Sequence, residues 1–344
     1  MSAITQNMHS NLVWLEQGDV VFRAQVANKP FSRAQLFKVP KDVISKESLG
    51  LKKILNESRK QRLQVYADCP VILVDEDPDN LELVLAVICY GIGKNSVVDY
   101  DTCLPFSTVV TMLHMGVKYR VDLLRNEAGR RLSKCFPSIL EEYNPRLFSD
   151  PSRNIRGKLV DVSRTDAFEV IRLAHQYRLH FLLPAAYYVA AQLPMRELFL
   201  ALETNQIPMI DFKRIVCAYT SLQRLSVHVV EEVLWQGPAK TCITHEMCRS
   251  KLNSLVSLAI RDSYEISPGP KKGCLDRRDV LESLMLQVYD CADCRAHVMA
   301  QHDTGRSATW DQLKTIFGLE DSRTAEGDME KHVSEREKAC MNYV

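Results

Sequence analysis

The chain has 344 residues, of which 46% are hydrophobic and 25% are charged, and its formal net charge is +1. These values are ordinary for a globular protein of this length, which is expected to contain one to three domains. A charge balance this close to neutral creates no overall field that would favour nucleic acid or an anionic membrane.

The N-terminus and the cysteine content indicate an intracellular protein. Residues 1–11 are polar and lack the apolar core of a secretory signal. The longest apolar run, 181–193, is interrupted by Pro184 and Gln192 and is shorter than the roughly 18–20 residues of a membrane helix. The 11 cysteines are odd in number and scattered, which suits a reducing compartment. We therefore expect a chain in the cytoplasm, the nucleus or both, without a membrane partner.

The first third of the chain alternates strand-like and helix-like segments. Short apolar runs bounded by polar residues predict strands at 19–24, 35–39 and 69–74. Helical spacing of apolar residues predicts helices at 40–48 and 78–92, and a helix or a helix followed by a loop at 50–66. The Gly-x-Gly-Lys sequence at 91–94 follows a helix rather than a strand, so it is not a phosphate-binding loop. Together these segments predict a small α+β module, a sheet covered by helices.

The rest of the chain is predicted to be helical. A helix pair is predicted at 106–118 and 121–136, and turn-forming residues dominate 143–157. Further helices are predicted at 165–177, 181–193, 211–235, 245–264, 278–302 and 310–319. The expected organisation is a lead-in at 1–13, the α+β module at 14–143, a linker at 144–157, an all-α domain at 158–320 and a disordered tail at 321–344.

The α+β module resembles a BTB/POZ domain. The match begins with Gly-Asp and a strand at 18–22, and continues with Phe-Lys-Val and the helix start at 37–48. It includes the acidic turn after Val74, and its most specific piece is the Leu-x-x-Gly-x-Lys-Tyr sequence at 113–119. Pro40 stands where the family usually has a histidine, so a role built on an Asp-His pair does not carry over. Proline is suited to a helix start because its missing N–H would be unpaired there.

The order of the two domains is similar to that of a fungal, basidiomycete-type family of BTB proteins. The matching features are the Phe-Pro segment at 136–143, the Cys-x-x-Cys at 291–294 and the Trp-x-x-Leu tail at 310–319. The resemblance implies a non-enzymatic adaptor that forms a homodimer through its first strand and helix and recruits a partner. It further implies a face for a cullin, as in a substrate adaptor of a cullin-type ubiquitin ligase. Self-association would need an exposed apolar patch around Trp14, Leu15, Val20, Phe22, Val43 and Ile44.

Four cysteines of the helical domain form the sharpest chemical pattern. Five residues separate Cys242 from Cys248, and Cys291 and Cys294 form a Cys-x-x-Cys pair. Four thiolates can bind zinc in a tetrahedral site, and such a site would link two helices. The other reading is a set of buried free thiols, since cysteine is a common core residue. A redox Cys-x-x-Cys is less favoured because no βαβ pattern surrounds it. A metal- or redox-dependent protein is therefore the alternative function.

No other pattern indicates catalysis or nucleic-acid binding. His114, His175, His180 and His228 occur singly, without a carboxylate and a nucleophile at a motif spacing. The sequence contains neither a zinc-finger spacing nor a strongly basic helix. We therefore expect no catalytic residues, no cofactor other than zinc and no nucleic-acid partner.

Overall fold

The computed structural model describes residues 8–26, 34–58, 63–94, 96–148, 157–264, 275, 281–282 and 291–319. The chain divides into two compact units. The first comprises Met1–Leu132 with Asn154–Asp161, and the second comprises Ser133–Arg153 with Val162–Val344. The divisions between the units fall within helix α5 (Asp122–Cys135), between residues 153 and 154 of the turn-rich segment, and after Asp161. The expected tail at 321–344 lies outside the described residues.

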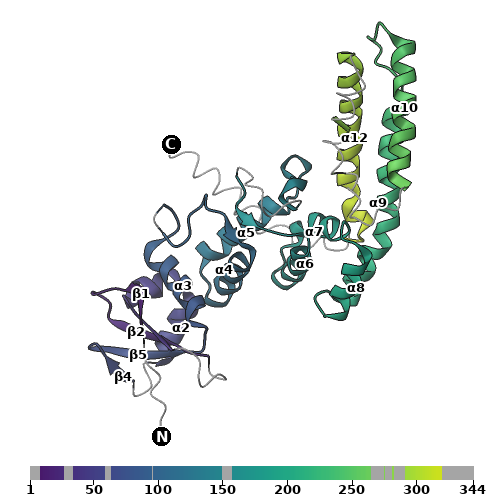
Figure 1. Ribbon diagram of the computed structural model, residues 1–344. Coiled ribbons are helices and arrows are strands. Elements are labelled where there is room, and N and C mark those ends of the chain that lie inside the picture. Colours follow the sequence, from purple (N-terminus) through teal and green to yellow (C-terminus); the bar gives the residue numbers. More distant parts are fainter. Residues whose placement is uncertain are drawn as a thin grey trace. The chain divides into compact units, whose positions relative to one another are not determined.

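A mixed five-stranded sheet, with the strand order β1-β3-β2-β5-β4, forms the base of the first unit (Figure 1). Its strands are β1 (Met8–Trp14), β2 (Val20–Ala24), β3 (Gln35–Val39), β4 (Gln64–Tyr66) and β5 (Cys69–Val74). The central strands β2 and β3 are antiparallel, whereas β5 runs parallel to β2 and β1 runs parallel to β3. This unit is α+β, as predicted.

The sequence did not indicate the two edge strands of this sheet. β1 begins inside the expected lead-in, and β4 lies in a segment predicted to be a helix or a helix followed by a loop. That helix, α2 (Leu49–Ser58), ends earlier than the predicted 66. All three residues of β4 are exposed, so its sequence carries no buried alternation that would mark it as a strand.

Helices cover one face of the sheet. α3 (Pro78–Tyr90) packs against β1 and β3, and both α1 (Lys41–Glu47) and α4 (Phe106–Tyr119) pack on α3. α3 is apolar on most sides and is accordingly buried on most sides. Its start is fixed by Asp77, whose carboxylate accepts a hydrogen bond of 3.0 Å from the backbone N–H of Asp79.

The early aspartate of the BTB-like pattern caps a helix. Asp19 Oδ1 accepts a hydrogen bond of 2.6 Å from the backbone N–H of Lys41, the first residue of α1. Pro40, which precedes Lys41, has an extended backbone and no N–H to be satisfied. The carboxylate of Asp19 therefore stabilises the start of α1 without help from a histidine at position 40.

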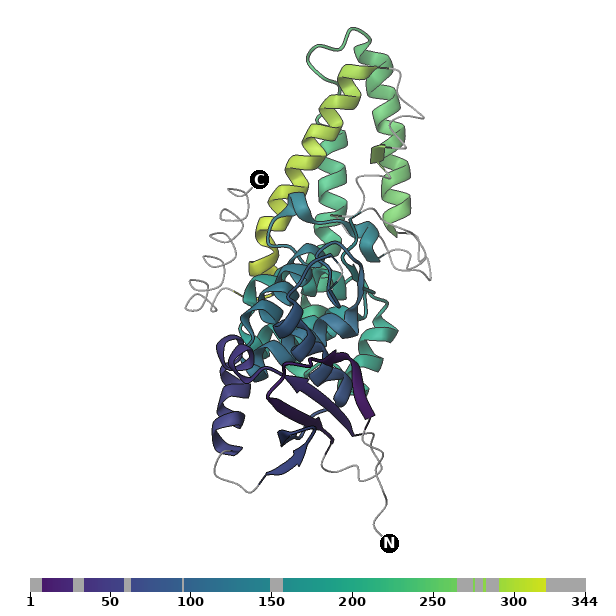
Figure 2. The same cartoon turned by 90° about the vertical axis from the view of Figure 1, so that its left-hand side faces the viewer.

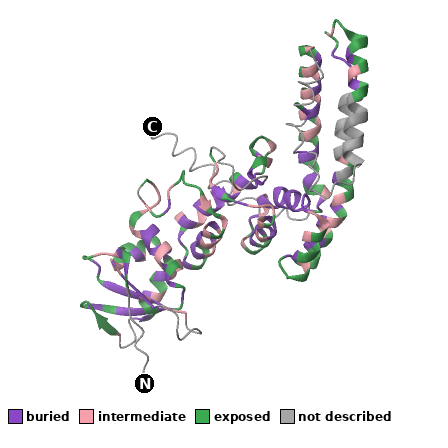
Figure 3. Ribbon diagram, viewed as in Figure 1, coloured by how far each residue is buried: buried purple, intermediate pink, exposed green. Residues whose placement is uncertain are grey.

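The second unit is helical throughout its described elements. They comprise short 3-10 helices η1 (Leu140–Glu142), η2 (Pro145–Phe148) and η3 (His180–Leu182), and the helices α6 (Asp166–Tyr177), α7 (Leu183–Ala190), α8 (Met195–Glu203), α9 (Met209–Trp235), α10 (His245–Tyr264) and α12 (Ala292–Ile316). α10 has the predicted bounds, and every residue of α7 is buried (Figure 3). No helix of the described residues is long and apolar enough to cross a membrane.

The last long helices lie side by side. Figures 1 and 2 show α9, α10 and α12 running alongside one another, and both α10 and α12 pack against α9. The sequence predicted two separate helices, at 278–302 and 310–319, but α12 runs without a break through 303–309. Most of 278–290 lies outside the described residues. Cys291, which falls inside the predicted helix 278–302, is the residue immediately before α12.

Candidate functional site

The structure places the six residues expected in a self-association patch in different environments. Val20, Phe22 and Ile44 are completely or almost completely buried in the core of the first unit. They are closed off from solvent, so they cannot belong to an exposed patch, and that part of the expectation is corrected. Val43 is exposed, and Trp14 and Leu15 are half-buried.

The first strand does present apolar surface, but through a residue that the sequence did not single out. β1 lies at an edge of the sheet, and Leu12 on it is 41% exposed. Trp14 stacks on the imidazole of His9 with 4.0 Å between the ring centroids, and it covers buried residues on the face of the sheet opposite the helices. Trp14 therefore serves the monomer's own packing, whereas Leu12 is available to another chain.

A second exposed apolar region lies where α8 meets α9. Four large hydrophobic side chains there are each at least half exposed: Phe199, Leu200, Met209 and Ile210. Phe199 also contacts the buried Phe212, with ring centroids 5.3 Å apart, which anchors α8 on α9. In Figure 3 the turn between these helices is largely exposed. Such a concentration of apolar surface is typical of a protein-binding region.

The four cysteines singled out from the sequence converge in the helical unit. Cys242 lies in the connection between α9 and α10, and Cys248 lies in the first turns of α10. Cys291 precedes α12 and Cys294 lies in its first turn. Their four sulfur atoms all lie within 4.8 Å of one another.

Hydrogen bonds to sulfur hold these thiols in place. The backbone N–H of Ala239 donates to Cys294 Sγ at 3.4 Å, and Thr244 Oγ1 lies 3.3 Å from Cys248 Sγ. Cys242 Sγ and Cys291 Sγ are 3.9 Å apart. Cys248 and Cys294 are buried, while Cys242 and Cys291 are partly exposed.

The thiols differ in how readily they ionise in the metal-free chain. Burial raises the pKa of the Cys294 thiol to about 12. Partial burial opposes ionisation of Cys242 as well, but hydrogen bonds from Thr244 and the neighbouring thiols lower its pKa to about 7. Four thiolates this close would repel one another. We therefore expect all four thiols to lose their protons only when they bind a cation.

The helical unit also contains a buried polar network that the sequence did not indicate. The Tyr187 hydroxyl donates a hydrogen bond of 2.5 Å to Asp211, and His175 Nε2 lies 3.5 Å from the same carboxylate oxygen. Burial by itself raises the pKa of the Asp211 carboxyl, but the hydrogen bonds from His175 and Tyr187 outweigh it and lower the pKa. These residues come from three helices, so no sequence spacing links them.

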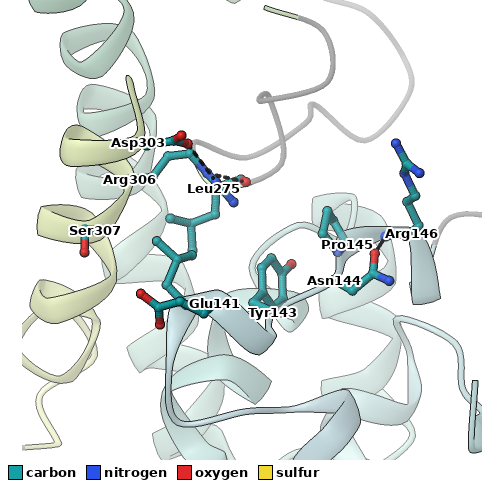
Figure 4. Close-up of a pocket in the computed structure, with 10 residues that line it drawn as sticks. Glu141, Tyr143, Asn144, Pro145, Arg146, Leu275, Asp303, Arg306 and Ser307 are labelled. Atoms are coloured by element: carbon teal, nitrogen blue, oxygen red, sulfur yellow. Dashed lines mark hydrogen bonds and ion pairs between the residues drawn. The ribbon is translucent and has the colours of Figure 1, made fainter. Parts of the chain in front are cut away.

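A pocket of about 460 Å³ lies between the 140–146 segment and α12 (Figure 4). Figure 4 shows Tyr143 and Glu141 on one side, with Asp303 and Arg306 projecting from α12 on the other. Arg306 donates a hydrogen bond of 3.0 Å to the carbonyl of Leu275 and pairs with Asp303 at 3.3 Å. This guanidinium is thus engaged by the protein itself.

Comparisons with protein-family models, with curated proteins and with solved structures found no match for this chain.

Proposed function

We propose that the chain is a non-enzymatic adaptor that self-associates through its α+β unit and recruits a second protein through its helical unit. The observation that carries this proposal is the presence of exposed apolar side chains in both units, at the β1 edge and at the α8–α9 turn. Apolar side chains on a protein surface favour contact with another protein. The resemblance of residues 14–143 to a BTB/POZ domain points to the same class of function.

Self-association is proposed at β1 with a second copy of the chain. β1 has seven residues and is an edge strand that pairs with the sheet through β3 alone, while the N–H of Leu12 is bonded to Ser10 and its carbonyl to Tyr90. Such an edge can pair with a strand of another molecule, and a side chain such as Leu12 would then pack across the contact. β4, the other edge strand, has three residues and offers a much shorter edge.

The helical unit would contribute the second contact. Phe199 and Leu200 on α8 lie close in sequence to the charged Arg196, Glu197 and Glu203. An apolar centre with a charged rim is the usual composition of a surface that binds a protein reversibly. This arrangement suits recruitment of a partner with a complementary apolar patch or helix.

A sharper form of the proposal is a substrate adaptor of a cullin-type ubiquitin ligase, and it rests on the resemblance alone. A pull-down with the N-terminal domain of a cullin at micromolar concentrations tests it. Retention of the full chain supports this form. If the chain is not retained, the cullin-adaptor form is wrong. Self-association is then tested by a separate experiment.

Hydrogen exchange measured at two protein concentrations tests the proposed β1 contact. Backbone amides of β1 should exchange more slowly at high concentration than at low concentration, because pairing with a second copy protects them. The Leu12→Asp variant should show no such difference. Equal exchange of β1 at both concentrations in the wild type would contradict the proposed contact.

A further inference from the structure

We propose that Cys242, Cys248, Cys291 and Cys294 bind one zinc ion, and that this ion fastens the start of α12 to the connection between α9 and α10. The four residues come from two segments that are about fifty residues apart in the sequence, and their sulfur atoms meet within 4.8 Å. The proposal is independent of the adaptor function, because it concerns how the helical unit is held together.

The spacing of the sulfur atoms fits a shared metal ion better than a disulfide. Four sulfurs at about 2.3 Å from a tetrahedral zinc ion are about 3.8 Å from one another. Cys242 Sγ and Cys291 Sγ are 3.9 Å apart, close to this value. A disulfide would bring two sulfurs to about 2.05 Å. The cluster is thus already close to the size required for a thiolate-zinc centre.

The surroundings favour the negative charge that four thiolates would carry. α10 and α12 both begin at the cluster, so their N-terminal ends direct positive partial charge toward it. The backbone N–H of Ala239 donates to Cys294 Sγ, and Thr244 contributes a hydroxyl beside Cys248. Hydrogen bonds of this kind orient metal ligands and are part of a metal site's outer shell.

The ligand set also indicates what the metal would do. Structural zinc sites have four protein ligands, whereas catalytic sites leave one position for water or substrate. Here four cysteines fill all four positions, and thiolates select zinc over magnesium or calcium. The ion would therefore act as a cross-link between two helix ends, not as a reaction centre. This role differs from that of a metal- or redox-dependent enzyme.

Zinc content of the purified full-length chain, prepared under reducing conditions and incubated with zinc, provides the test. Wild type should retain about one zinc ion per chain after desalting. Cys291→Ser should bind zinc at least about tenfold more weakly. Cys217→Ser, which changes an exposed cysteine of α9 outside the cluster, is the matched control and should bind like wild type. A wild type without zinc, or a Cys291→Ser variant with wild-type affinity, would overturn the proposal.

Cobalt substitution of the wild type keeps the proposal testable if Cys291→Ser fails to fold. Cobalt bound by four thiolates in a tetrahedral site gives strong visible absorption and a sulfur-to-cobalt charge-transfer band. Addition of zinc should displace it and remove both signals. Weak absorption typical of cobalt surrounded by water, with free thiols still titratable, would count against the site.

Discussion

The hydroxyl of Tyr119, at the end of α4, donates a hydrogen bond of 3.1 Å to Glu76 in the turn between β5 and α3. Lys118 Nζ lies 2.5 Å from the same carboxylate oxygen, and Asn80 and the backbone N–H of Asp77 donate to the other. The Lys-Tyr pair and the acidic turn, two separate features of the BTB-like pattern, therefore form one buried network that joins α4 to the sheet.

We expect Tyr119→Phe to lower the free energy of unfolding by about 1–3 kcal/mol, because the change leaves a buried carboxylate short of a donor. Tyr90→Phe is the matched control, since the hydroxyl of Tyr90 makes an exposed hydrogen bond to the carbonyl of Leu12 and should matter less. Urea denaturation of both variants provides the measurement. Equal stability of Tyr119→Phe and wild type would show that Glu76 does not need this donor.

Acid should weaken the same network. Burial alone would raise the pKa of Glu76, but its hydrogen bonds, first from Lys118, lower the pKa below the ordinary value of 4.5. A carboxyl whose pKa is depressed on folding contributes stability above its unfolded pKa and loses that contribution as the pH falls through the folded pKa. We therefore expect Glu76→Gln to destabilise the chain at neutral pH and to reduce the loss of stability on acidification. A pH series of urea denaturation midpoints tests this, and an unchanged pH dependence in Glu76→Gln would contradict it.

Arg131 illustrates a residue whose role the sequence could not reveal. It lies at helical spacing from the buried Leu124 and Ala128 of α5, and its own side chain is completely buried. Its guanidinium pairs with the buried Glu127 at 2.7 Å. It also donates to the backbone carbonyls of Asp99, Thr102 and Leu159. These partners come from segments that are distant in sequence, so only the folded structure brings them together.

Replacement of Arg131 by methionine should destabilise the chain by about 3–5 kcal/mol, since it removes one of the two arginines that pair with the buried Glu127 and the donor to the carbonyls of Asp99 and Thr102. Lysine should not restore stability, because one ammonium group cannot reproduce the fork of N–H donors. Arg172→Met is the control, as it breaks a surface ion pair with Glu169 worth about 0–1 kcal/mol. Thermal unfolding compares the three variants, and similar losses for Arg131→Met and Arg172→Met would refute this assignment.

Gly116 is predicted to be intolerant of alanine for a steric reason. A Cβ atom at this position would lie 2.7 Å from the backbone nitrogen of Arg125, where α4 and α5 approach each other. Gly116→Ala should therefore cost about 1–3 kcal/mol of stability despite the better helix propensity of alanine. Val117→Ala, at an exposed position on the same helix, should cost less than about 1 kcal/mol. Chemical denaturation that finds Gly116→Ala neutral would mean that the helices can move apart.

The sequence predicted the elements with strong apolar patterns and missed those defined by long-range contacts. The central strands β2 and β3 lie where expected and are buried at four of their five residues each, and α10 has the predicted bounds. β4 is exposed, and β1 has three polar residues in succession followed by three apolar ones, so neither has the alternation of a half-buried strand. The cysteine pairs were recognisable because the two members of each pair lie close together in the sequence. The Asp211 network was not, because its members come from three separate helices.

The solution mass of the full-length chain, measured by light scattering over a range of concentrations, tests the adaptor account most directly. We predict that wild type approaches twice the mass of one chain as the concentration rises. Leu12→Asp should remain a monomer, because a carboxylate would be buried in the β1 contact. Leu73→Asp, at an exposed position on β5, should still associate. A wild type that stays monomeric at every concentration would contradict self-association, and a Leu12→Asp variant that dimerises like wild type would contradict its proposed location.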